Sequence, residues 1–493
     1  MQAKRLFLGL TATLLIAMTG MAQDIKEAST DTLMKHIQTL SSERYQGRMS
    51  GTESYFDAAQ YVINELSHYG VQPYKGEWLQ LFEIECNEVE SASLYTHSMR
   101  DNATEKYVLG NDFVCAASTG SGYTNSPAAF CGYGIDHESF NEYRAMDVKG
   151  KVVIVMSGVP NFMAADIAEQ YSTIRDKARV ARQHGAHSLI VVNMSETTRP
   201  DEVQLRLYNG EGEYFDKFPI LLVTKNCGSA LLNGEPKSFE ECLASLQGEH
   251  KMQSFLMDKN IEINVNAHHS SRSVTANVVG VLPGFEKPMS NEYIVVGAHL
   301  DHSGSQGTTC MFPGADDNAS GVAAVLETAR LLSLQQFEPA KRSVMFVFFA
   351  GGEMQSLGSR IFVSNIKPLK DIEAFINAEC IGSGDSIAVL GNKRFPALYG
   401  IADSLDQAGD KMMVHGFETA PRGDAAAFAH IGIPSLVFST LNGNKHVHTP
   451  SDIAEDIDRN MVTKAATLMF KTVYELTWGD YQGRSRRSKA YKF

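Results

Sequence analysis

The sequence has no excess of basic residues, and after residue 22 it has no apolar run long enough to cross a bilayer. Its 493 residues include 44 Lys and Arg against 57 Asp and Glu, which gives a formal net charge of −13. A nucleic-acid-binding protein normally presents a basic face to the phosphate backbone, so no nucleic-acid partner is expected. No membrane span is expected in the mature chain either.

Several catalytic motifs are also absent. The chain has no HExxH helix motif, no GxSxG elbow and no GxxxxGK[ST] loop, which disfavours single-zinc proteases of that type, serine hydrolases and phosphate-cradling enzymes. It has seven Cys but no CxxC, so no cysteine-based zinc or redox motif is indicated. Cys115 with Cys131 and Cys227 with Cys242 are possible disulfide pairs, although sequence cannot decide the connectivity.

The first 22 residues have the pattern of a cleavable signal peptide. Lys4 and Arg5 precede an apolar run over 6–18, and Gly20, Met21 and Ala22 offer small residues near a cleavage point. We therefore expect a periplasmic or secreted protein. The basic residues after Gln482 are expected to form a solvated tail over 481–493.

The remaining chain is long enough for two domains, and 43% of all residues are hydrophobic. Residues 23–104 begin with two predicted helices, the first capped by Asp31 and the second over about 54–68. Residues 105–255 are predicted to form a compact inserted domain, with strands over 151–156, 188–192 and 220–223 and a helix that includes 177–182.

Residues 256–480 show a regular alternation of strands and helices. Strands are predicted over 293–297, 343–349, 374–377 and 435–438, and a helix over 319–332. This order predicts an α/β fold with a mostly parallel, twisted sheet and helices on both faces. Ligands of such sheets bind at the carboxyl ends of the strands.

Acidic and imidazole side chains follow these predicted strands. They are His299, Asp301, Asp316, Asp317, Glu353, Glu379 and His448. Carboxylates that converge at one edge repel each other unless cations neutralise them, and mixed His and carboxylate ligands suit zinc, with cobalt or manganese as alternatives. Two His and three carboxylates are too many for one catalytic zinc, so we expect two metals and hydrolysis of an amide or ester.

The motifs that carry these residues resemble those of the co-catalytic zinc exopeptidases of the bacterial leucyl aminopeptidase type, metallopeptidase family twenty-eight. They are GAHLD at 297–301, PGADDNASG at 313–321, AGGEMQSLGS at 350–359, INAECIG at 376–382 and HTPSD at 448–452. The resemblance implies metal ligands at His299, Asp317, Glu353, Glu379 and His448, with Asp317 as the bridge. It also implies that Asp301 orients His299 without contacting the metal.

The resemblance extends over most of the chain. LSSERYQGRMSGTESYFDAAQYVINELSHYGVQP at 40–73 is similar to the family's N-terminal helices. GYGI, DVKGKVVIVMSGVP and KARVARQHGAHSLIVVN are similar to a protease-associated domain. It implies an aminopeptidase with two Zn²⁺ and a peptide substrate, and it leaves the oligomeric state open.

Two positions depart from the family. Relatives carry a general-base Glu where this chain has Gly352, and SDH where it has Gly423, Asp424 and Ala425. A general base typically contributes roughly 100- to 10,000-fold in rate, so the protein is expected either to hydrolyse peptides weakly or to be a metal-loaded binding protein. In the second case, Gly352→Glu should restore activity. A glutaminyl cyclase with a single zinc is a third alternative, which metal analysis would decide.

The other polar residues near these motifs have simpler interpretations. Asp316 is expected to cap or hydrogen-bond rather than bind metal. His446 is expected to be a loop residue, and His268 and His269 to lie ahead of the sheet. Cys310 and Cys380 are expected to fill the core.

Overall fold

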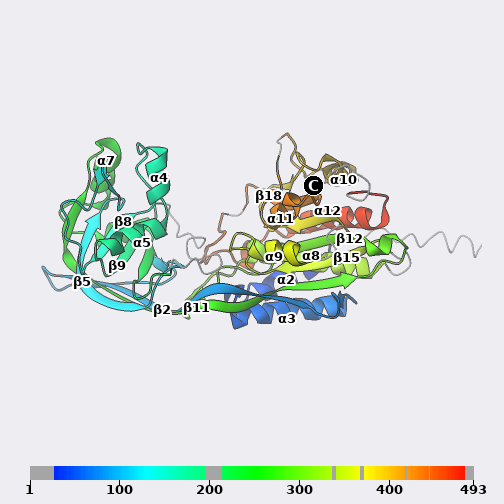
Figure 1. Cartoon of the computed structure of the whole chain (residues 1–493), viewed down its shortest axis with the longest axis horizontal. Coiled ribbons are helices and arrows are strands. Elements are labelled where there is room, and N and C mark those ends of the chain that lie inside the picture. The colour runs from blue at the N-terminus through cyan, green and yellow to red at the C-terminus, as the bar shows by residue number, and fades with distance from the viewer. Residues whose placement is uncertain are drawn as a thin grey trace, which may run out of the picture.

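The computed structural model describes residues 27–194, 214–335, 340–366, 371–416, 419–443 and 445–483. The predicted signal peptide over 1–22 and most of the predicted basic tail lie outside them. Figure 1 shows an elongated molecule in which two groups of elements are joined by a pair of long strands. Within the described residues, no helix is both long and apolar enough to cross a membrane.

The two long strands carry one sheet through both groups. β2 (Leu79–Ser98) pairs antiparallel with β11 (Ser254–Leu282) along most of its length. At one end β11 pairs with β5 (Gly122–Cys131), and at the other with β15 (Ser343–Phe349). The resulting strand order is β17-β18-β16-β12-β15-β11-β5-β8-β9-β10-β4.

The sheet of the C-terminal group is parallel at its centre, as the sequence predicts. β12 (Tyr293–His299) lies between β15 and β16 (Ile372–Ala378), parallel to both, and β16 is parallel to β18 (Ser435–Leu441). The antiparallel pairs lie outside this centre, where β17 (Ser386–Leu390) pairs with β18 and β11 with β15. The predicted mostly parallel α/β fold is confirmed.

Helices cover both faces of this sheet, which is why its strands are apolar throughout. Ile294 and Val296 of β12 pack in one core, with helices on that face, and Val295 packs in another core on the opposite face. The first face carries α2 (Thr30–Leu40), α3 (Glu53–His68), α8 (Gly321–Ser333), α10 (Pro396–Ala408) and α12 (Arg459–Trp478). The second carries α9 (Leu357–Asn365) and α11 (Asp424–His430).

The two N-terminal helices match their prediction except at one cap. α3 begins after Thr52, whose side chain accepts a hydrogen bond from the amide of Tyr55. The predicted cap of α2 by Asp31 is wrong, because Ser29 has the extended backbone of an N-cap residue and accepts from the amide of Thr32. Asp31 lies in the first turn and forms an ion pair with Arg459.

The other group of elements contains a second parallel sheet segment, formed by β5, β8 (Val152–Met156), β9 (Ser188–Val192) and β10 (Ile220–Val223), with β4 (Phe113–Cys115) antiparallel at its edge. The predicted helix is α5 (Ile174–Gln183), and the described residues of this group form three others: α4 (Ala165–Tyr171), α6 (Lys225–Leu231) and α7 (Phe239–Gly248). Two further cores support these elements, and one of them also includes Cys310 and Phe312 from the C-terminal group. The bounds 105 and 255 for an inserted domain remain a prediction.

Short elements complete the fold. They are η1 (Glu43–Arg48), β1 (Gln72–Pro73), β3 (Thr104–Tyr107), β6 (Asp136–His137), β7 (Phe140–Asn141), η3 (Met289–Asn291), β13 (Ser305–Gln306), β14 (Cys310–Met311), η4 (Ala315–Ser320) and η6 (Ala454–Asp456). All seven cysteines are buried and free, so neither suggested disulfide pair is joined.

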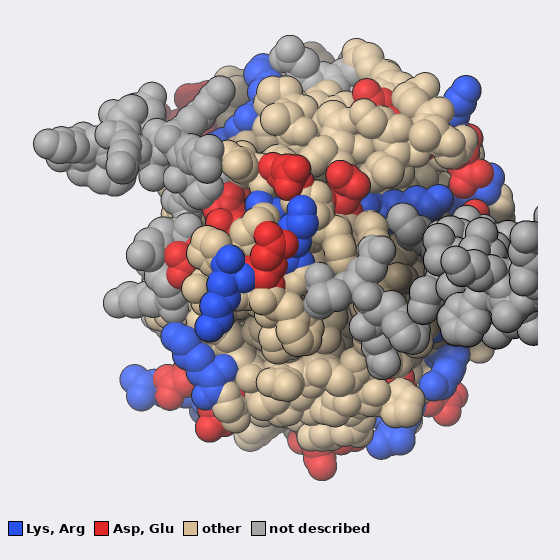
Figure 2. Space-filling view, turned by 90° about the vertical axis from the view of Figure 1, so that its right-hand side faces the viewer, with Lys and Arg blue, Asp and Glu red and all other residues tan. Residues whose placement is uncertain are grey.

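Charges are mixed on the end of the C-terminal group. Figure 2 shows Lys and Arg side chains interspersed with Asp and Glu side chains on the visible part of this face.

Candidate metal centre

The strand ends bring the predicted ligands together. His299 is the last residue of β12, Glu353 follows β15, Glu379 follows β16, and His448 lies in the loop after β18. Asp317 lies in η4, the irregular turn that leads into α8. Because β12, β15, β16 and β18 are parallel, their carboxyl ends meet at one edge of the sheet, and all five side chains point into one buried region.

The first potential metal-binding group consists of His299, Asp317 and Glu379. His299 Nε2 lies 3.3 Å from Asp317 Oδ1 and 3.5 Å from Glu379 Oε1. The other ring nitrogen, Nδ1, lies 3.0 Å from the main-chain oxygen of Asp301, to which it can donate a hydrogen bond. That bond would leave Nε2 as the atom that faces the two carboxylates, as a metal-ligating histidine requires.

The second group contains a histidine that the sequence did not reveal as a candidate. It consists of His302, Asp317, Glu353 and His448. His448 Nε2 lies 2.8 Å from Asp317 Oδ2 and 2.9 Å from Glu353 Oε2. His302 Nδ1 lies 2.9 Å from Glu353 Oε1. The only sequence signal for His302 is its place one residue after GAHLD, in a stretch with no periodicity to indicate where its ring points.

The donors of both groups suit divalent transition metals. Each group combines imidazole nitrogen with carboxylate oxygen, the usual ligands of zinc. Asp317 belongs to both groups, with Oδ1 facing His299 and Oδ2 facing His448, so one carboxylate can be shared by two ions. The thiol of Cys380 lies 3.6 Å from Asp317 Oδ1, to which it can donate a hydrogen bond, and burial raises its pKa well above the usual value. Cys380 belongs to neither metal-binding group.

The histidines balance much of the carboxylate charge in this region, and Arg48 adds a further positive charge nearby. Burial would lower the pKa of His299, but Glu379 and Asp317 outweigh it and raise the pKa well above its usual value. Burial also opposes protonation of His448, yet Glu353 and Asp317 raise its pKa to about 11. Burial and Asp317 act to raise the pKa of Glu353, but His448 and His302 lower it to about 2. A bound cation would take the place of these imidazole protons.

Gly352 lies against the centre with no space for a side chain. Its amide donates a 2.8 Å hydrogen bond to Asp301 Oδ1. A Cβ atom at this position would lie 2.3 Å from Cβ and 2.4 Å from Cγ of His299, closer than such atoms ever approach. The carboxylate of Asp301 is 3.9 Å from His299 Nδ1, so the main chain of Asp301, rather than its carboxylate, makes the close contact with His299.

Asp316 and Asp452 build the turn that presents Asp317. Asp316 accepts hydrogen bonds from the amide of Gly382 and the hydroxyls of Ser320 and Ser383, and it belongs to neither metal-binding group. Asp452 accepts from the amides of both Asp316 and Asp317, at 2.8 and 3.0 Å. Asp452 is the last residue of the HTPSD motif, which was the sequence signal available for it.

Arg48 holds the loops behind the centre. Its buried guanidinium donates to the main-chain oxygens of Leu40, Leu300, Pro313 and Gly314, at 2.7–2.9 Å. These bonds fix the loop after His299 against the loop before Asp317. In the sequence, Arg48 lies ahead of the second predicted helix, and no motif marks it as a site residue.

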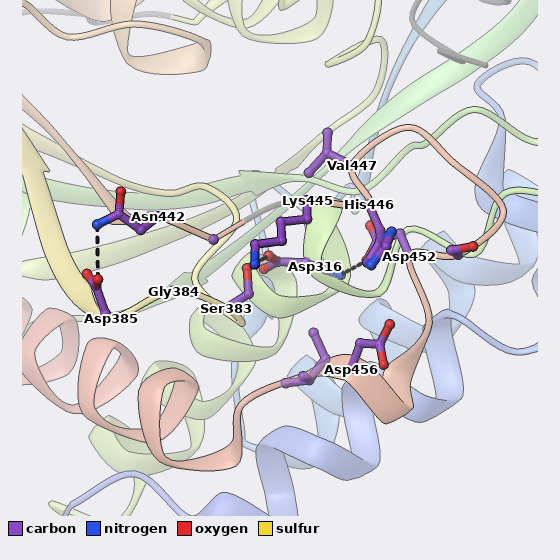
Figure 3. A pocket seen from close by; sticks show the side chains of 13 residues that line it. Asp316, Ser383, Gly384, Asp385, Asn442, Lys445, His446, Val447, Asp452 and Asp456 are labelled. Carbon is purple, nitrogen blue, oxygen red and sulfur yellow. Dashed lines mark hydrogen bonds between the residues drawn. The ribbon is translucent and has the colours of Figure 1, made fainter. Parts of the chain in front are cut away.

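The remaining histidines lie away from both groups. His269 pairs with Glu85 at 2.7 Å on the β11–β2 ribbon, and His268 lies beside it on β11. His446 is an exposed residue of the loop before His448. It lines a cavity of about 430 Å³ with Asp316, Ser383, Lys445 and Asp452, shown in Figure 3. This cavity borders the centre, and no member of either metal-binding group is among the described residues that line it.

Comparison with known families assigns both parts of the chain. The model of peptidase family M28 matches residues 277–473, a range that contains every residue of both groups. The model of the PA domain matches residues 104–231. The part of the chain that holds both groups belongs to peptidase family M28.

Curated relatives of this M28 protein are named as aminopeptidases. The probable lipoprotein aminopeptidase LpqL of Mycobacterium tuberculosis is 29% identical over 72% of this chain and 59% of its own length. Aminopeptidase YwaD of Bacillus subtilis is 24% identical over 74% of this chain and 71% of its own. A probable leucine aminopeptidase of Arthroderma otae is 27% identical over 41% of this chain and 58% of its own, so the chain spans about three fifths of the length of some of these relatives.

Solved structures share the whole fold of the M28 protein. BSAP, a zinc aminopeptidase from Bacillus subtilis, is 20% identical, with 93% of this chain and 97% of that chain covered at a TM-score of 0.65. The aminopeptidase from Aneurinibacillus sp. strain AM-1 is 19% identical, with the same coverage and a TM-score of 0.63. The arrangement of the M28 and PA parts along the long β2–β11 ribbon is therefore one that other structures share.

Proposed function

We propose that this protein is an exported aminopeptidase that binds two zinc ions and removes N-terminal residues from peptides at a low rate. The observation that carries the proposal is the pair of ligand groups that share Asp317. The family and the names of its relatives support peptide hydrolysis from the N-terminus. Export rests on the signal-peptide pattern of residues 1–22, which lie outside the described structure.

The chain's own residues would prepare the site for hydrolysis. Bound divalent ions would polarise a substrate carbonyl and acidify water. His299, Asp317 and Glu379 would hold one ion, and Asp317, Glu353 and His448 the other. The main-chain oxygen of Asp301 keeps the ring of His299 in place, and Asp452 keeps the turn of Asp317 in place.

Gly352 motivates the low rate. No proton-accepting side chain can stand at 352 in this backbone, because its Cβ would overlap His299.

Asp424 is another acid of this region, and both of its oxygens are buried with no hydrogen-bond partner among the described residues. Burial raises its pKa to about 7, with His299 opposing the shift and Glu379 adding to it. A carboxyl group with such a pKa can exchange protons near neutral pH.

The test is hydrolysis by the mature, zinc-loaded protein. A panel of aminoacyl and dipeptide substrates should be turned over slowly, and His299→Ala should abolish the turnover. His446→Ala is the matched control, since it removes a neighbouring histidine that belongs to neither group, and it should retain the activity. Turnover no higher than that of the His299→Ala variant would reject hydrolysis.

The same experiment separates the second candidate, a metal-loaded peptide-binding protein without hydrolysis. Gly352 favours it, because the usual general base is missing. Peptide binding in a zinc-dependent manner, without product over long incubation, would establish this candidate instead. One zinc per chain would favour the single-zinc alternative.

A further inference from the structure

We infer that His302 is a fourth protein ligand of the ion held by Asp317, Glu353 and His448, so that the two metal sites are unequal. This inference rests on the proposed two-metal function. One site would be closed by four protein groups, and the other, at His299, Asp317 and Glu379, would have three. Four protein ligands are typical of tightly held zinc, and three are typical of zinc sites that keep a position open.

The distances fit one ion surrounded by four ligands. In tetrahedral zinc with bonds of about 2.0–2.1 Å, the ligand atoms lie roughly 3.3–3.4 Å apart. His302 Nδ1 is 2.9 Å from Glu353 Oε1 and 3.7 Å from Asp317 Oδ2. These separations bracket the tetrahedral value, as they should if small rotations of the side chains admit an ion. All four ligand atoms lie within 4.8 Å of one another.

The ring of His302 is held in this position by its surroundings. A Cβ atom at Gly314 would lie 2.5 Å from Cγ and 2.6 Å from Cδ2 of His302, so the ring occupies space that only glycine leaves free. Gly314 also has a φ of +60°, which favours glycine. The amide of His302 donates to the main-chain oxygen of Arg48, whose guanidinium in turn binds Gly314.

His302 lies in a buried cluster of potential metal ligands. The side chain of His302 is fully buried, among two carboxylates and the ring of His448, whose centroid is 5.6 Å away. An ion in this cluster would bind the imidazole and both carboxylates together, and it would take the place of the proton between His302 Nδ1 and Glu353. The competing explanation is that His302 binds no metal and that its Nδ1–H donates a hydrogen bond that fixes the carboxylate of Glu353.

Two variants distinguish a ligand from a hydrogen-bond donor. His302→Ala removes both possibilities. His302→Asn places an amide near the position of Nδ1 and can still donate to Glu353, but it lacks the imidazole nitrogen. His446→Ala serves as the matched control. Circular dichroism checks that each variant is folded, and zinc affinity and stoichiometry are measured by chelator competition.

The inference expects wild-type protein and His446→Ala to bind two zinc ions, one more tightly than the other. In both His302 variants the tighter affinity should fall by more than about 100-fold, beyond the 10- to 100-fold typical of residues that only support a ligand. His302→Asn within about tenfold of wild type would overturn the inference. If wild type binds no zinc, the proposed function itself fails.

A crystal structure of the zinc-loaded protein gives an independent readout. Anomalous scattering should place a zinc ion about 2.0–2.1 Å from His302 Nδ1. A zinc ion held by Glu353 and His448 but more than about 3 Å from His302 Nδ1 would overturn the inference and leave the two-metal function intact.

Discussion

Replacing Gly352 by Glu should damage the metal centre rather than restore a general base. The resemblance of the motif alone suggests a gain, because it implies a general-base Glu at this position. The structure predicts the opposite, since the first carbon of any side chain at 352 would lie 2.3–2.4 Å from the Cβ and Cγ atoms of His299. The obstacle is contact rather than backbone conformation, because Gly352 does not have a positive φ.

The size of the effect follows from this contact. Both of these atoms lie close to the main chain of His299. The side chain therefore cannot rotate away from the clash without moving Nε2 away from Asp317 and Glu379. Overpacking of a buried site costs about 1–3 kcal/mol. If the free energy of zinc binding becomes less favourable by this amount, the zinc affinity of the group that contains His299 falls roughly 5- to 150-fold. Gly352→Ala should show most of the loss, because the clash begins at Cβ.

The assay compares zinc content and turnover of aminoacyl-4-nitroanilides for wild type, Gly352→Ala and Gly352→Glu. Gly400→Ala in α10 is the matched control, since a Cβ there would meet nothing within 4 Å. It should leave zinc binding unchanged. Full zinc content together with a large increase in turnover for Gly352→Glu would refute the reasoning, and it would show that the 350–353 segment can move to admit a side chain.

Three further predictions concern the surroundings of the centre. Asp317→Asn should lower the affinity for both zinc ions, whereas Glu379→Gln should weaken mainly one, because only Asp317 belongs to both groups; titration with zinc measures this. Arg48→Met should lower the free energy of unfolding by at least about 3 kcal/mol in urea, because it leaves four main-chain oxygens without their buried donor. Burial, partly opposed by Glu65, lowers the pKa of His36 to about 4. Between pH 6.5 and 4, His36 is therefore protonated in the unfolded chain but neutral in the folded chain. Stability should therefore fall by up to about 3 kcal/mol as pH drops through this window, and His36→Asn should remove that part of the pH dependence.

The apolar strands could be predicted because their residues are buried on both faces. Runs such as Val152–Met156 and Ser343–Phe349 leave no other interpretation at that length. β11 was not predicted, although it is the longest strand. Many of its 29 residues are exposed or only half-buried, and its pairing with β2 includes two register shifts, so no single alternation runs along it.

The metal ligands were predicted from sequence motifs. The residues that were missed, Arg48 and His302, make their contacts with residues distant in sequence. Arg48 donates to main-chain oxygens at Leu300 and Pro313, 252 and 265 residues away. Every residue has a main-chain oxygen, so the sequence does not indicate which of these oxygens accept hydrogen bonds from Arg48. His302 was missed for a related reason. Its ring direction is set by the absence of a side chain at Gly314, and sequence does not show which two segments approach each other.

Two glycines therefore shape the centre by making room for two histidines. Gly352 admits the ring of His299 to one group, and Gly314 admits the ring of His302 to the other. An acid at 352 and His299 in its present position are mutually exclusive in this backbone. The departure at 352 is thus tied to the position of a metal ligand and cannot be reversed by one substitution. Restoring a base would require the 350–353 segment to withdraw, which would break the bond from Gly352 to Asp301.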